Sequence, residues 1–89
     1  MDTDGQSEDQ VTRLTNTTML YDGMRETLNA LRSELLHHAK HRGTERGREQ
    51  ARTRSVEVLA ELHRVDPYDR AQIIAQRERW LSELVRLNR

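Results

Sequence analysis

The stretch "LTNTTMLYDGMRETLNALRSELLHH", residues 14–38, decides the fold of this 89-residue chain. Mostly apolar positions recur in it at alternating steps of three and four, which is the spacing of one helix face and of a coiled-coil seam. Gly23 is its one weak helix former. The pattern predicts an amphipathic helix over about 11–42, with a seam formed by Leu14, Thr17, Tyr21, Met24, Leu28, Leu31, Leu35 and His38.

Two further helices are expected downstream. Gly43 and Gly47 leave open whether residues 43–47 form a loop or a weak continuation of the first helix. The sequence "VDPYD" at 65–69 marks a boundary, because Asp66 can cap a helix that begins at Pro67. A second helix over about 48–65 carries the apolar residues Val58, Leu59, Leu62 and Val65. A third over 67–88 carries Ile73, Ile74, Trp80, Leu81, Leu84, Val85 and Leu87.

These elements predict an all-α fold without strands. The short joint at 65–67 favours a tight antiparallel hairpin of the second and third helices, and the long first helix either packs on this hairpin or pairs with its copy. An unpaired first helix would expose its leucine seam, which favours a helical bundle formed by dimerisation. Leu28→Asp or Leu31→Asp should then break the oligomer, whereas Arg48→Ala should not.

Composition also favours self-association. The chain is 34% hydrophobic and 34% charged, with no Phe, one Trp and no Cys, so its core material is thin and it has no disulfides. Residues 1–10 carry four acids and no base and predict a disordered acidic tail before a single helical domain at 11–89. The chain has no long apolar run and no signal-like N-terminus, so we expect a cytoplasmic protein without membrane contact.

A basic stretch lies at residues 40–54. Arginine and lysine clusters of this kind can bind phosphate or an acidic protein surface. However, Glu45 with Arg48 and Glu49 with Arg52 have helical salt-bridge spacing, and no aromatic residue is present for base stacking. A solvated, self-paired helix face is therefore the favoured interpretation, over nucleic-acid or acidic-partner contact by Lys40, Arg42, Arg46, Arg48, Arg52 and Arg54.

A histidine cluster precedes this stretch. His37 and His41 are four residues apart, the spacing at which two imidazoles on a helix can share one ion. Exposed histidines beside an acid are the favoured interpretation, and a surface metal site is the alternative, with candidate ligands Glu34, His37, His38 and His41.

Arg77 falls within the apolar face expected for the third helix. An unpaired buried charge is costly, so this arginine should reach an acid or an external partner. Glu26, Glu57 and Glu61 are the expected internal partners. Trp80 beside it is a core residue or an interface anchor.

The predicted function is a non-enzymatic interaction or regulatory module that forms a homodimer and binds a protein partner. The alternatives are a small nucleic-acid-binding regulator that uses the basic stretch and a surface histidine metal site. The sequence has no phosphate-binding glycine loop, no nucleophile elbow and no thiol, so we expect no catalytic residue and no cofactor.

Overall fold

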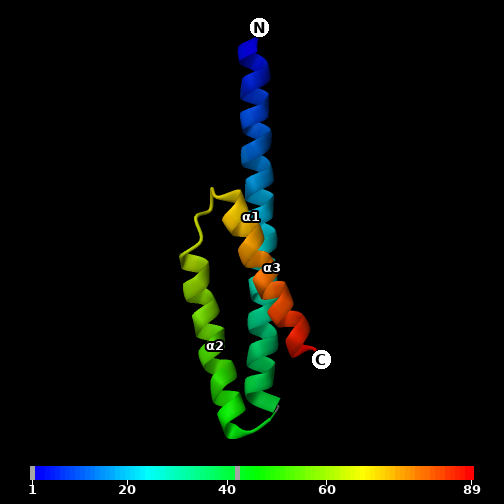
Figure 1. Cartoon of the computed structure of the whole chain (residues 1–89), viewed down its shortest axis with the longest axis vertical. Coiled ribbons are helices and arrows are strands. Elements are labelled where there is room, and N and C mark those ends of the chain that lie inside the picture. Colours follow the sequence, from blue (N-terminus) through cyan, green and yellow to red (C-terminus); the bar gives the residue numbers. More distant parts are fainter. Residues whose placement is uncertain (1, 42) are drawn as a thin grey trace.

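The residues that the structure describes form three α-helices in sequence (Figure 1). The computed structural model describes the backbone of residues 2–41 and 43–89, and the side chains of residues 16–41 and 43–89. Helix α1 spans Asp2–His41, α2 spans Glu45–His63 and α3 spans Arg70–Leu87. No strand occurs among the described residues, which confirms the all-α class.

Helix α1 is longer than its hydrophobic pattern indicates. It has 40 residues and begins at Asp2, whereas the pattern predicts a start near residue 11 and a disordered tail before it. Negatively charged side chains are favourable near the positive end of a helix dipole, and residues 2–10 are acidic. This composition is therefore compatible with the helical backbone that the structure gives to this segment.

Helix α2 is not a continuation of α1, because α1 ends at His41 and α2 begins at Glu45. Gly43 adopts φ 75°, a left-handed conformation that glycine tolerates and that commonly ends a helix. Thr44 then caps α2, because its Oγ1 accepts a hydrogen bond from the backbone N–H of Gly47 at 3.1 Å. Helix α2 therefore starts at Glu45 rather than at 48, and Gly47 lies within its first turn.

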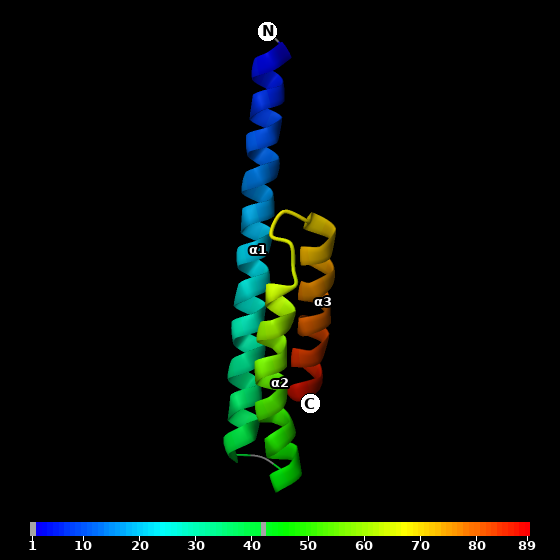
Figure 2. The same ribbon diagram turned by 90° about the vertical axis from the view of Figure 1, so that its left-hand side faces the viewer.

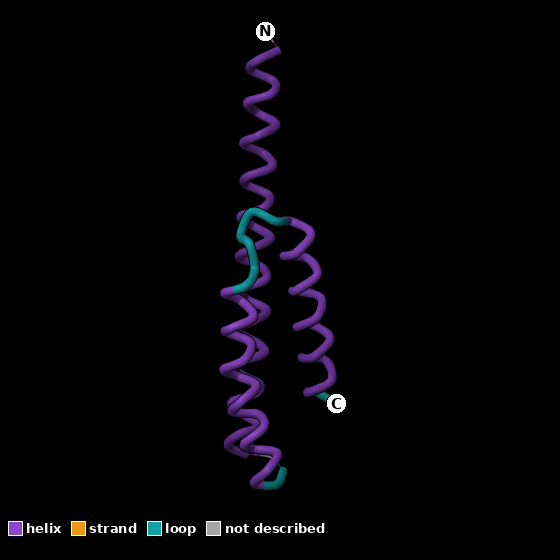
Figure 3. The backbone as a smooth tube through the Cα atoms, turned by 60° about the vertical axis from the view of Figure 1, so that its left-hand side comes forward, coloured by secondary structure: helices purple, strands orange, loops and turns teal. Residues whose placement is uncertain are grey.

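The connection between α2 and α3 is longer than predicted. The Asp66 side chain accepts a hydrogen bond from the N–H of Tyr68 and forms a local turn instead of capping a helix at Pro67. Asp69 is the actual cap, since its carboxylate accepts from the N–H of Gln72. Figure 3 shows this connection as the longest teal segment.

Both shorter helices pack on α1. The backbones of α2 and α3 do not approach each other closely, so the predicted tight hairpin of these two helices is wrong, although side chains connect them. Helix α1 offers apolar residues on a broad arc, and α2 and α3 occupy neighbouring parts of it (Figure 2). The buried apolar residues from the three helices are Met24, Leu28, Leu31, Leu35, Ala39, Ala51, Val58, Ile73 and Trp80, with Val65 from the connection.

Because of this packing, the leucine seam of α1 is covered by helices of its own chain. Met24, Leu28, Leu31 and Leu35 are buried within a single chain, and Tyr21 packs against the same core. The premise that this seam would be exposed without a second copy is therefore wrong for residues 21–35. Leu14 lies outside the residues whose side chains are described.

The molecule is elongated, with extents of 65 × 22 × 15 Å. Residues 16–41 of α1 together with α2 and α3 form what we call the body. Residues 2–15 form a helical arm that stands clear of both other helices in Figures 1 and 2. No helix in the described part of the chain has the length and apolar character needed to cross a membrane.

Candidate functional site

The basic stretch lies mostly on the exposed side of α2 and is largely neutralised there. Arg48 Nη2 lies 3.1 Å from Glu45 Oε2, and Arg52 Nη2 lies 3.3 Å from Glu49 Oε2. The self-pairing predicted from the spacing is thus present. Lys40 and Arg46 are exposed and have no acidic partner among the described residues, and Arg42 lies outside them.

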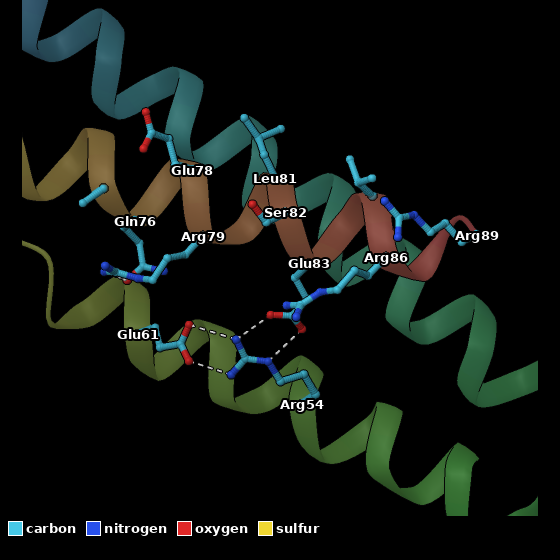
Figure 4. Close-up of a pocket in the computed structure, with 12 residues that line it drawn as sticks. Arg54, Glu61, Gln76, Glu78, Arg79, Leu81, Ser82, Glu83, Arg86 and Arg89 are labelled. Carbon is cyan, nitrogen blue, oxygen red and sulfur yellow. Dashed lines mark hydrogen bonds and ion pairs between the residues drawn. The ribbon is translucent and has the colours of Figure 1, made fainter.

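Arg54 belongs to a different environment from the rest of the stretch. Its side chain is only 28% exposed and reaches across to α3, where it donates two hydrogen bonds of 2.7 and 2.8 Å to Glu83. It also donates hydrogen bonds of 2.6 and 3.2 Å to Glu61, which lies two turns further along α2 (Figure 4). Arg54 therefore joins α2 to α3 and is not part of a surface for phosphate.

Trp80 contacts the cluster of Arg54, Glu61 and Glu83 from the core side. Its indole is fully buried, and Nε1 donates a hydrogen bond of 2.9 Å to Glu61 Oε1. A buried tryptophan N–H usually finds such an acceptor. Trp80 is thus a core residue in this chain. Its link to Glu61 ties the buried face of α3 to α2.

The electrostatics of the cluster follow from these contacts. Hydrogen bonds to Glu83 and Glu61 raise the pKa of the Arg54 guanidinium above its ordinary value. Burial favours the neutral form of Glu61, but the hydrogen bonds from Arg54 and Trp80 outweigh it, so the pKa of this carboxyl is lower than usual. Arg54 is thus hydrogen-bonded to Glu61 and Glu83, and Trp80 to Glu61. These contacts indicate a structural link between α2 and α3.

The four candidate metal ligands do not converge. His38 Nε2 is 3.5 Å from Glu34 Oε1, and the exposed rings of His37 and His41 are tilted to each other with centroids 4.9 Å apart. The rings of His37 and His38 meet edge to face at 6.3 Å. No group of three or more histidine, cysteine or acidic residues could hold a metal ion in the part of the chain that the structure describes.

Arg77 is on the rim of the packed face of α3, not at its centre. The buried residues of this helix are Ile73, Gln76 and Trp80, so the helix is rotated relative to the predicted face. Arg77 is exposed and forms no ion pair with Glu26, Glu57, Glu61 or any other described residue. The expected internal salt bridge is therefore wrong, and the rotation also leaves Val85 55% exposed.

Arg77 instead lies over α1 beside the base of the arm. A Cβ atom placed on Gly23 would lie 3.9 Å from Arg77 Nε, an ordinary van der Waals distance, so the guanidinium lies against this turn of α1. Together they line an open groove between α1 and α3 of about 400 Å³, with Asn16, Met19, Leu20 and Arg70 as the other lining residues. The hydrophobic pattern points to Arg77 but not to Arg70, although Arg70 precedes it by seven residues and so shares its helix face.

A second groove of about 1200 Å³ lies between α2 and α3 (Figure 4). It contains the paired Arg54, Glu61 and Glu83, so most of its charge is already satisfied within the chain.

Comparison with known proteins adds no functional information. No family model matches this chain, and neither a curated protein nor a solved structure shows significant similarity to it.

Proposed function

We propose that this chain is a non-enzymatic self-association module whose protruding arm pairs with a second copy, and that the assembly binds a protein partner. The observation that carries the proposal is the difference in helix length: α1 has 40 residues, whereas α2 has 19 and α3 has 18. The backbone of the arm therefore extends beyond both α2 and α3 (Figure 1). Most helical stability in proteins comes from tertiary packing, so a second surface would stabilise the arm.

Apolar residues near the arm support this proposal. Met19, at the base of the arm, is 66% exposed, and the arm sequence itself contains Val11 and Leu14. Exposed apolar residues that lie close together often mark an interaction surface. The interface of the proposed dimer is thus the arm and its base. The seam at residues 21–35 serves the core of one chain.

The other two candidate functions have less support. Arg48, Arg52 and Arg54 are held by acids, which lowers the positive charge available to a phosphate backbone. Glu34 and the histidines form no group of three or more ligands for a metal ion among the described residues.

The test is the oligomeric state of the full chain, measured by sedimentation equilibrium at micromolar concentrations. We expect a concentration-dependent dimer for the wild type and a monomer for Val11→Asp/Leu14→Asp. Leu36→Asp is the matched control, because Leu36 is an exposed leucine of the body, and it should remain dimeric. Circular dichroism should show a folded body in every case. A monomeric wild type, or a dimer that tolerates the double substitution, would contradict the proposal.

A further inference from the structure

The groove at the base of the arm combines an apolar side with unpaired positive charge. Met19 and Leu20 of α1 contribute the apolar side, and Gly23 lies between them and α3. Arg70 and Arg77 contribute the other side. Neither arginine side chain has an ion pair or hydrogen bond with any described residue, in contrast to Arg48, Arg52 and Arg54. The surface is suited to an acidic segment that also carries apolar residues.

The two arginines have a fixed spacing. They are seven residues apart on α3, so their Cα atoms lie about 10.5 Å apart along one side of the helix. An acidic helix with carboxylates at the same interval would match them. Guanidinium groups bind carboxylates through paired hydrogen bonds, which gives such contacts directional preference as well as attraction.

The arm sequence has this chemistry. Residues 2–10 contain Asp2, Asp4, Glu8 and Asp9 and no basic residue, and Asp2 and Asp9 are also seven apart. The apolar Val11 follows directly. The acidic part of the arm and the groove are therefore complementary in charge, in spacing and in apolar content.

The arm cannot reach the groove of its own chain. Both are attached to the same continuous helix, and residue 6 lies about 20 Å from residue 19 along its axis. In a symmetric dimer whose two-fold axis crosses the arms, the two α1 helices run antiparallel. The acidic end of each arm then extends toward the body of the other copy.

We infer that the groove lined by Met19, Leu20, Gly23, Arg70 and Arg77 receives the acidic segment 2–10 of a second copy of this chain. The inference rests on the proposed self-association and specifies its contacts. Each dimer contains two identical sites, and Arg70 and Arg77 of each copy pair with carboxylates of the partner arm. The attraction is between exposed charges, so it should weaken as salt increases.

Two charge-reversal variants of the full chain test this arrangement. The groove variant is Arg70→Glu/Arg77→Glu, and the arm variant is Asp2→Lys/Asp4→Lys/Glu8→Lys/Asp9→Lys. A control variant, Arg86→Glu/Arg89→Glu, makes the same charge change at exposed arginines near the other end of α3. Each is examined alone and in an equimolar mixture by sedimentation equilibrium at low salt, with circular dichroism to verify folding.

We expect the groove variant and the arm variant each to be monomeric, and their mixture to form a dimer. In the mixed dimer both sites again join opposite charges, whereas each variant alone joins like charges. The control variant should dimerise like the wild type. If the wild type dimerises but the two variants also dimerise alone, or if the mixture stays monomeric, the inference is overturned while self-association stands. A monomeric wild type overturns both proposals and leaves the groove to an acidic segment of another protein.

Discussion

The ionisation of Glu61 is linked to folding through the contacts of its carboxylate. Its carboxylate accepts hydrogen bonds from Arg54 and from the Trp80 indole. Although burial favours the neutral form, these contacts outweigh it and lower the pKa of the carboxyl from its ordinary value of 4.5. A carboxyl with a lowered folded-state pKa contributes stability above its unfolded-state pKa, and this contribution is lost as the pH falls through the folded-state value.

We therefore expect wild type to lose free energy of unfolding more steeply than Glu61→Gln when the pH falls below 4.5. At neutral pH, Glu61→Gln should be the less stable of the two, because it loses its charge-assisted contacts. Urea denaturation at a series of pH values measures both effects. Arg54→Gln removes a donor to Glu61, so its free energy of unfolding should also fall less steeply below pH 4.5 than that of wild type. Parallel curves for wild type and Glu61→Gln would show that this carboxyl is not linked to folding.

Residue-level features were predictable from the sequence only where they are local. The pairs Glu45/Arg48 and Glu49/Arg52 depend on spacing within one helix, and both are present. The contact of Arg54 with Glu83 depends on how α2 and α3 are rotated where they pack on α1. The hydrophobic period of one segment does not specify this rotation. The misplacement of Arg77 has the same origin: Ile74, Leu81 and Val85 suggest an apolar face that the packed α3 turns partly to solvent.

At the level of the elements, the break between α1 and α2 rests on a single backbone conformation. Gly43 has φ 75°, and any residue with a Cβ is strained there even though nothing lies within 4 Å of the added atom. We expect Gly43→Ala to lower the free energy of unfolding by about 1 kcal/mol. Gly47→Ala is the matched control, since Gly47 lies in the first turn of α2 and alanine is the better helix former.

Gly47→Ala should leave stability unchanged or raise it slightly, although its Cβ would lie 3.4 Å from Thr44 Oγ1. Thermal and urea unfolding of the two variants provide the comparison. Equal effects at both glycines would mean that the left-handed conformation of Gly43 contributes nothing to the break.

Helix existence was predictable from the sequence, and helix ends were less so. The three apolar patterns identify three helices, because each recurs at the helical period over several turns. The ends depend on which of several capping residues is used. Thr44 and Asp69 cap α2 and α3, while Asp66 forms a turn with Tyr68. Competing caps separated by three residues look alike in sequence.

At the level of the whole molecule, the seam of α1 was correctly located but its partner was not. An amphipathic stripe specifies a face to bury and not the surface that covers it. Here α2 and α3 together cover Met24, Leu28, Leu31 and Leu35, so one chain supplies its own core. The proposed self-association therefore involves a different part of α1, the arm, whose backbone extends beyond the other two helices.

Leu31 separates these two arrangements experimentally. Its side chain is fully buried within one chain, so Leu31→Ala should lower the free energy of unfolding by about 3 kcal/mol, the usual cost of the lost packing and the cavity. If Leu31 serves only the core, this loss should be the same in urea denaturation at low and high protein concentration. Arg48→Ala, which removes an exposed pair, should change stability by less than about 0.5 kcal/mol. A Leu31→Ala chain that keeps its stability but no longer dimerises would show instead that the seam joins two copies.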